Sequence, residues 1–167
     1  MVLITGSTGF IGKGLLKQLV DMGIDVRILL KPSSQSPNLP RGIAFDVAIS
    51  SSSDLRGIRA ALNGVRTVIH LASNERYGLR GYDPEREILG TRNLAEASAE
   101  TDIQRLIFLS HLGVNLTSAY PVLRTKAMEE EVIRKSGVPF TIIRSSVVYG
   151  PEDHFTTSIA RQLSLLP

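Results

Sequence analysis

The stretch Thr5-Gly6-Ser7-Thr8-Gly9-Phe10-Ile11-Gly12 decides how the rest of the chain is interpreted. Its three glycines follow the short apolar run Val2–Thr5 and precede a segment whose apolar residues recur at helical spacing. Glycine triplets also occur in ordinary turns, but between a strand and a helix they are typical of a phosphate-binding loop. The first glycine permits a tight turn, the second lets the backbone approach a pyrophosphate, and the third lets the helix pack on the strand. The amides at the start of the helix would then face the phosphates.

The remaining chain alternates short apolar runs with longer segments of helical period, ending in a helix over Thr156–Leu165. Strands that are apolar throughout are buried on both faces, and the helices between them provide the cover. The order predicts one α/β domain over residues 1–167, a doubly wound parallel sheet (Rossmann fold) of about six strands with helices on both faces. The predicted strands are Val2–Thr5, Val26–Leu30, Ile43–Phe45, Val65–Leu71, Leu106–Leu109 and Phe140–Ile143.

Composition excludes several classes of function. The 167 residues are 43% hydrophobic and 21% charged, which is typical of a globular domain, and the net charge of +3 comes from scattered basic residues. A nucleic-acid-binding surface needs a clustered basic stripe, so we expect no nucleic-acid partner. Without cysteine there is no disulfide, thiolate metal site or cysteine nucleophile. The histidines show no metal-ligand spacing, and no apolar run reaches the length of a membrane span. We therefore expect a soluble, cytoplasmic domain with no metal.

The chain resembles the extended and atypical short-chain dehydrogenases/reductases over nearly its whole length. The matching segments are Thr5–Gly12, Val68–Ser73, Gly90–Leu94, Thr125–Ala127 with Glu130, and Ile142–Arg144 with Tyr149–Pro151. The segments Leu109–Leu112, Leu123–Ala127 and Gly150–Phe155 resemble one branch, the NmrA-like proteins and the NADPH-binding accessory subunit of respiratory complex I. Relatives in this family continue into a C-terminal region that supplies most of the substrate pocket. The resemblance thus implies that 151–167 begin a largely missing region.

The resemblance implies a dinucleotide cofactor, and the residues at the end of the second predicted strand bear on whether it is NAD(H) or NADP(H). The residues assigned to the cofactor are Gly6, Ser7, Thr8, Gly9, Phe10, Ile11, Gly12, Lys31, Asp46, Val47, Leu71, Ala72, Ser73 and Lys126. An acid after the second strand would bind the ribose 2′-hydroxyl of NAD, but here Lys31 stands in a segment without acids. A lysine attracts a 2′-phosphate, which predicts a preference for NADP(H). Alternatively, Lys31 is a solvated loop lysine, and Asp46 caps a turn instead of contacting the adenine amino group.

The reaction centre of the family uses a Tyr-x-x-x-Lys pair and a serine. Tyrosine four residues before lysine lies on the same helix face, where the lysine lowers the pKa of the phenol. Lys126 matches the lysine, but Val122 stands at the tyrosine position. Tyr120 precedes Pro121, which places it in the loop before the helix. Ser110 resembles the family serine, although a satisfied hydroxyl at a strand end is an equal alternative.

Two functions from different classes follow from these residues. Val122 and the missing C-terminal region favour an NADP(H)-binding structural or regulatory module with little or no turnover, acting with a protein partner or as a homo-oligomer. The alternative is an NADPH-dependent oxidoreductase acting on a small carbonyl substrate, for which Lys126, Ser110 and Tyr120 are the candidate catalytic residues. A sugar-nucleotide epimerase is a weaker third function, because it also needs the tyrosine.

Overall fold

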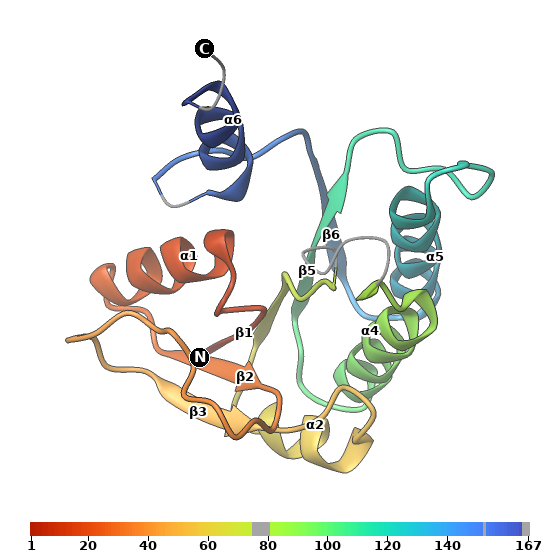
Figure 1. Cartoon of the computed structure of the whole chain (residues 1–167). Coiled ribbons are helices and arrows are strands. Elements are labelled where there is room, and N and C mark those ends of the chain that lie inside the picture. The colour runs from red at the N-terminus through yellow and green to blue at the C-terminus, as the bar shows by residue number, and fades with distance from the viewer. Residues whose placement is uncertain (75–80, 152, 165–167) are drawn as a thin grey trace.

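The computed structural model describes residues 1–74, 81–151 and 153–164. Its centre is a six-stranded, all-parallel sheet in the order β3-β2-β1-β4-β5-β6 (Figure 1). The strands are β1 Val2–Thr5, β2 Val26–Leu30, β3 Asp46–Ile49, β4 Thr67–His70, β5 Arg105–His111 and β6 Phe140–Ser145. From β1 the chain builds outward to β3 on one side and then to β6 on the other. The strand order therefore reverses between β1 and β4, the place where open α/β sheets bind ligands.

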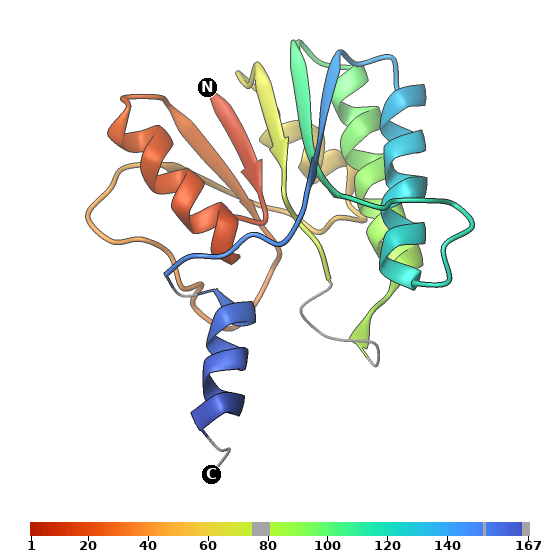
Figure 2. The same ribbon diagram turned by 90° about the horizontal axis from the view of Figure 1, so that it is seen from above.

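The helices cover both faces of the sheet, as Figure 2 shows. They are α1 Phe10–Asp21, α2 Leu55–Ala61, α4 Pro84–Ala99, α5 Pro121–Lys135 and α6 His154–Ser164. Helix α1 lies on one face, and α2, α4 and α5 lie on the other. The predicted doubly wound Rossmann fold is confirmed.

The core consists of two apolar clusters, one on each face of the sheet. Adjacent residues of β1 belong to different clusters: Leu3 packs with residues of α2, α4 and α5, while Ile4 packs with Leu16 of α1. Both strand residues are fully buried. Since side chains alternate between the faces of a strand, burial on both faces explains why β1 is apolar throughout.

The third strand does not lie where the sequence predicts it. The prediction was Ile43–Phe45, but the strand that pairs with β2 is Asp46–Ile49. This strand forms an edge of the sheet and is mostly exposed. Its run Val47-Ala48-Ile49 is as apolar as Ile43-Ala44-Phe45, so apolar character alone does not identify which of the two runs pairs with β2. Ile43 and Phe45 belong to the preceding segment and pack against the α1-side cluster. Their apolar character reflects packing and not strand pairing.

Helix α6 stands apart from the sheet in both views (Figures 1 and 2). Asp153 anchors its start, because its carboxylate accepts hydrogen bonds from the amides of Gly150 and Thr156. The Gly150 amide, with the Thr156 side chain, lowers the pKa of Asp153 to about 2. Along α6 the apolar residues Phe155, Ile159 and Leu163 are exposed. Within the described residues, no helix is both long and apolar enough to span a membrane.

Candidate functional site

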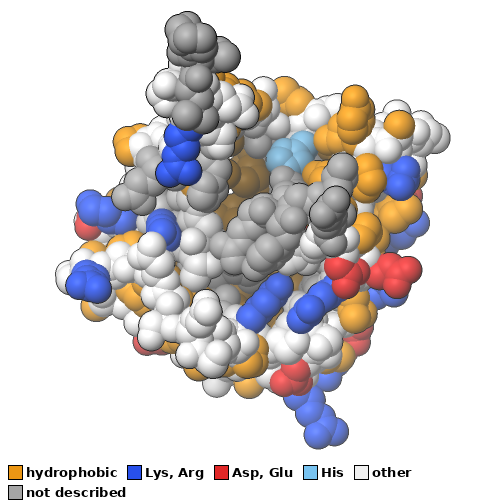
Figure 3. Space-filling model, viewed as in Figure 1, with side chains coloured by type: hydrophobic (Ala, Val, Ile, Leu, Met, Phe, Trp, Pro, Cys, Tyr) orange, Lys and Arg blue, Asp and Glu red, His pale blue; other side chains and the backbone are white. Residues whose placement is uncertain are grey.

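A cleft of about 1530 Å³ runs along the carboxyl edge of the sheet, at the point where the strand order reverses. Its floor comes from the ends of β1, β2 and β4, and its walls come from the start of α1, residues 33–40 and the first turns of α4. In the space-filling view, the Lys and Arg side chains visible on this face are scattered (Figure 3). The cleft is therefore a groove for a small ligand and not part of a continuous basic stripe.

Two glycines of the loop between β1 and α1 have no room for a side chain. Gly6 has a φ of +75°, and a Cβ there would lie 2.7 Å from the backbone nitrogen of Ala72. A Cβ on Gly12 would lie 2.2 Å from the carbonyl oxygen of Gly6. The loop, the start of α1 and the end of β4 are thus in backbone contact, as the glycine spacing predicts.

The start of α1 is free to receive an anion. Gly9 is the N-cap residue and has no side chain to cap the helix, and the first turn contains no acid. A Cβ on Gly9 would meet only the carbonyl oxygen of Gly6, at 3.3 Å. The Ser7 hydroxyl is buried and has no hydrogen-bond partner among the described residues, although Ser7 lines the cleft. Uncapped amides and an orphan hydroxyl fit the pyrophosphate of a dinucleotide.

Most of the predicted cofactor residues line this cleft, and a smaller group lies behind it or elsewhere. Those that line it are Gly6, Ser7, Thr8, Gly9, Phe10, Lys31, Leu71, Ala72 and Ser73. Gly12 is buried behind the loop and Ile11 lies beside it in α1. Asp46, Val47 and Lys126 lie elsewhere.

Asp46 lies at the far end of its strand from the cleft. It is the first residue of β3, and its carboxylate accepts a hydrogen bond from the Arg27 guanidinium at 3.3 Å. The expectation that Asp46 follows the third strand is wrong, because that strand begins at Asp46. Ser50 and Ser52 occupy the carboxyl end of β3 and line the cleft, and sequence reasoning missed both. Correct placement of the edge strand would have found them.

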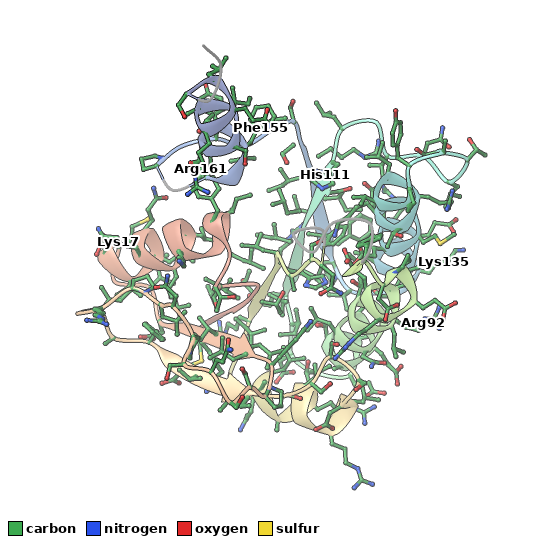
Figure 4. The ribbon with its side chains drawn as sticks, viewed as in Figure 1. Lys17, Arg92, His111, Lys135, Phe155 and Arg161 are labelled. Carbon is green, nitrogen blue, oxygen red and sulfur yellow. The ribbon has the colours of Figure 1, made fainter. Side chains whose placement is uncertain are left out.

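Within the part of the chain that the structure describes, four cationic side chains line the cleft. Lys31 is exposed at the end of β2, as predicted, and Lys13, Lys17 and Arg86 line the cleft as well. Lys17, labelled in Figure 4, also forms an ion pair with Asp21 at 2.8 Å. Sequence reasoning missed the last three cations, although the four-residue spacing of Lys13 and Lys17 after the glycine loop places both on one side of α1.

Lys126 lies in the interior between two glutamates. Its ammonium nitrogen is 2.9 Å from Glu87 Oε1 and 2.9 Å from Glu129 Oε2, and it lies 5.1 Å from the centre of the Phe108 ring. Burial alone would lower the pKa of Lys126, but the carboxylates of Glu129 and Glu87 hold it above its ordinary value. The ammonium group is therefore permanently charged and already paired within the protein.

The same buried network continues to the base of the glycine loop. Thr91 Oγ1 donates to Glu129 Oε1 and lies 2.9 Å from His70 Nε2. His70 Nδ1 lies 2.6 Å from Thr5 Oγ1, at the end of β1. Burial, with the nearby charge of Lys126, lowers the pKa of His70 to about 3. His70 is thus a neutral structural residue, and burial likewise raises the pKa of Glu129.

Ser110 belongs to a second buried cluster. It is fully buried and donates to Glu130 Oε1 at 2.7 Å, while Arg144 donates to both Glu130 oxygens at 2.9 and 2.7 Å. Burial opposes the charge of Glu130, but the hydrogen bonds from Arg144 and Ser110 lower its pKa below the ordinary value. The serine is therefore a satisfied hydroxyl at a strand end.

The structure does not bring the three predicted catalytic residues together. Tyr120 precedes α5, as predicted, and it is 72% exposed. Lys126 and Ser110 lie in separate buried clusters. Figure 4 labels His111 at the end of β5, and Figure 3 shows a histidine there beside a hollow with an apolar floor. Among the described residues there is no group of His, Cys, Asp or Glu that could hold a metal ion.

Comparison with known proteins agrees with this geometry. A family model described as NAD(P)H-binding matches residues 6–161. The chain belongs to this NAD(P)H-binding family. Together with its relatives and the structures that it resembles, this match confirms the prediction of an atypical short-chain dehydrogenase/reductase with a Rossmann fold.

Two relatives and one solved structure show what this chain is similar to. Subunit 9 of the NADH dehydrogenase (ubiquinone) 1 alpha subcomplex of Rattus norvegicus is 30% identical over 94% of this chain and 43% of its own length. Photosystem II assembly factor Ycf39 of Cyanophora paradoxa is 26% identical over 86% of this chain and 44% of its own. The Bordetella bronchiseptica enzyme WbmH, solved in complex with NAD+, shares the fold with a TM-score of 0.80 at 18% identity, over 98% of this chain and 62% of its own. The chain thus spans less than half the length of these two relatives.

Proposed function

We propose that this NAD(P)-binding domain binds NADP(H) in preference to NAD(H) and serves as a structural or regulatory module with little or no turnover. One observation carries the proposal: the loop that receives phosphates is open and has an orphan hydroxyl, whereas Lys126 and Ser110, at the positions of the reaction centre, are paired with buried glutamates.

The preference for NADP(H) is supported by charge at the end of β2. Lys31 stands there without a neighbouring acid, and Lys13 lines the same cleft from α1. An acid at the end of β2 would bind the ribose 2′-hydroxyl of NAD and repel a 2′-phosphate. A lysine attracts the 2′-phosphate as a point charge.

Low turnover is supported by the residues at the three reaction-centre positions, none of which is a positioned proton donor. A bound nicotinamide can supply a hydride, but reduction of a carbonyl also needs an acid beside the carbonyl oxygen. Val122 stands where the family has its tyrosine, Tyr120 is exposed before α5, and the Lys126 ammonium is held by Glu87 and Glu129. General acid catalysis commonly contributes about 10²–10⁴ in rate, so its loss makes reduction slow.

A protein partner or a second copy of the chain is part of the same proposal. It is supported by relatives whose names describe a subunit of a larger complex and an assembly factor. The cytoplasmic location expected from a chain without cysteine is also retained as a proposal.

The test is a calorimetric titration of the chain with NADPH, NADP+, NADH and NAD+. We expect NADPH and NADP+, which contain the 2′-phosphate, to bind at least tenfold more tightly than NADH and NAD+. Equal affinities for the two pairs would contradict the assignment of Lys31. The protein saturated with NADPH is then offered a panel of small carbonyl compounds, and we expect no NADPH oxidation above the rate without protein. Turnover that disappears in Tyr120→Phe would instead establish the oxidoreductase alternative.

A further inference from the structure

Glu87 connects the wall of the cleft to the buried charges. It lies in the first turn of α4 and is 6% exposed. Its Oε1 accepts hydrogen bonds from Ser73 Oγ at 3.0 Å and from Lys126 Nζ at 2.9 Å. Its Oε2 accepts one from the backbone N–H of Asn74 at 2.9 Å. Both oxygens of one carboxylate are therefore occupied by donors from the end of β4 and from α5.

The segment held by Glu87 faces the ligand. Ser73 and Asn74 are the third and fourth residues after β4 and line the cleft, as Glu87 itself does. Hydrogen bonds to a charged carboxylate are about twice as strong as those between neutral groups. The position of this part of the wall thus depends on Glu87 staying in place.

Lys126 keeps Glu87 in place. The lysine side chain is 3% exposed and contacts Glu87 and Glu129 at equal distances, so it balances two buried carboxylates. Without the lysine, two buried carboxylates would lack a counter-charge, which strongly disfavours the ionised pair. The Glu87 carboxylate would then turn towards water, and its contacts with Ser73 and Asn74 would weaken.

We propose that Glu87 is the positioning residue for the cofactor-facing wall at Ser73 and Asn74, and that Lys126 affects the cofactor only through Glu87. This assignment differs from a lysine that contacts the cofactor ribose itself. It rests on the proposed function insofar as the ligand is NADP(H), but the anchoring of the wall is a property of the unliganded chain.

The two roles of Lys126 predict opposite effects for one substitution. Glu87→Ala removes the anchor but leaves the lysine paired with Glu129. A positioning role predicts that NADPH binds at least fivefold more weakly. A ribose-binding lysine, released from one of its two carboxylates, would leave NADPH affinity unchanged or raise it.

The experiment compares Glu87→Ala, Lys126→Met and the double variant Glu87→Gln/Lys126→Met with wild type. Lys135→Met is the matched control, because Lys135 is an exposed lysine of the same helix that pairs with Glu131. Two quantities are measured: NADPH affinity by calorimetry, and hydrogen exchange of the Asn74 amide by NMR in the unliganded protein. Glutamine at position 87 keeps an acceptor for the Asn74 amide and needs no counter-charge. The double variant is therefore expected to recover NADPH affinity and the slow exchange of this amide.

We expect Glu87→Ala and Lys126→Met to speed Asn74 exchange at least tenfold and to weaken NADPH binding at least fivefold. The double variant should return both quantities to within about threefold of wild type, and Lys135→Met should change neither. Unchanged exchange in Glu87→Ala, or a double variant no better than Lys126→Met, would overturn the proposal. If Lys126→Met does not fold, Glu87→Ala alone distinguishes the two roles of Lys126, because one role predicts weaker NADPH binding and the other predicts unchanged or tighter binding. A wild type that binds no NADPH would remove the proposed function, while the exchange measurement still decides the role of Glu87.

Discussion

The glycine loop and the interior behind β4 and β5 differ in whether their buried polar side chains have hydrogen-bond partners. In the loop, the buried hydroxyl of Ser7 has no partner among the described residues. Behind the strands, the equally buried Ser110 donates to Glu130, and Lys126 contacts two glutamates. A buried hydroxyl without a partner costs about 1–3 kcal/mol. The contrast teaches that a match to a family residue type does not by itself place a side chain in the binding site: Ser7 lines the cleft, whereas Lys126 and Ser110 are paired within the protein.

The largest expected effect comes from filling the loop. We expect Gly9→Val to lower NADPH affinity about a hundredfold or more, roughly 3 kcal/mol, because the side chain would occupy the approach to the phosphates. The fold should persist, since a Cβ at Gly9 comes no closer than 3.3 Å to the nearest atom. Gly12→Val is the contrasting variant and should destabilise the fold itself, because its Cβ would lie 2.2 Å from the Gly6 carbonyl oxygen. Calorimetry and urea unfolding separate the two effects, and normal NADPH binding by Gly9→Val would show that this is not the phosphate loop.

A substitution in the interior cluster of Ser110 and Glu130 is expected to lower stability and leave NADPH affinity unchanged. Glu130→Ala should lower the free energy of unfolding by about 2 kcal/mol, because it leaves the Ser110 hydroxyl buried without its acceptor. NADPH affinity should stay within about twofold of wild type, since Ser110 is not among the residues that line the cleft. Urea unfolding and calorimetry measure the two quantities. A loss of affinity without a loss of stability would place Ser110 in the binding site after all.

The next effect concerns the cations of the cleft. We expect Lys31→Asp to remove or reverse the preference for NADP(H), at a cost of about 1–3 kcal/mol in NADPH binding for the lost charge-assisted contact. Lys135→Met is the control for a change in overall charge. The ratio of NADPH to NADH affinity is the measurement, and an unchanged ratio would identify Lys31 as a solvated loop residue.

A smaller effect should appear in acid. The pKa of Glu130 is lowered in the folded protein, so its contribution to stability is present above the unfolded value of about 4.3 and is lost as the pH falls through the lower folded value. Glu130→Gln should therefore lose less stability than wild type between pH 6 and pH 3. Urea unfolding at a series of pH values gives the change of unfolding free energy with pH for wild type and for Glu130→Gln. Equal changes in the two proteins would show that Glu130 is not responsible for the loss of stability in acid.

The smallest effect is expected at α6, which belongs to neither region. Phe155, Ile159 and Leu163 are 53%, 42% and 63% exposed, and uncovered apolar surface promotes association. We expect the chain to bind a hydrophobic dye and to self-associate weakly. Ile159→Asp should reduce dye fluorescence and the apparent mass in light scattering by a modest, measurable amount. A wild type that stays monomeric and binds no dye would contradict this.

The sequence predicts those parts of the molecule that depend on neighbouring residues. Alternation of apolar runs and helices identified the sheet, and the spacing of Gly6, Gly9 and Gly12 identified the loop, because each signal lies within a few residues. The edge strand β3 was misplaced because an apolar run of three residues stands on each side of Asp46, and no local pattern shows that the second run is the one that pairs with β2. The pairing of Lys126 with Glu87 joins residues 39 positions apart, and no local pattern indicates it. Only Glu129, three residues after the lysine on the same helix, was a signal available in the sequence.

The chain of contacts through His70 also has a direction. Thr91 donates its only hydroxyl proton to Glu129, so it must accept from His70, whose proton therefore resides on Nε2. The other ring nitrogen then accepts from Thr5, and the Thr5 oxygen in turn accepts from the amide of Ala72. Every donor along this line points from the backbone of the cleft towards one buried carboxylate. The tautomer of a single imidazole is thereby fixed from both ends, and the line has a polarity that can reverse only if Glu129 gains a proton.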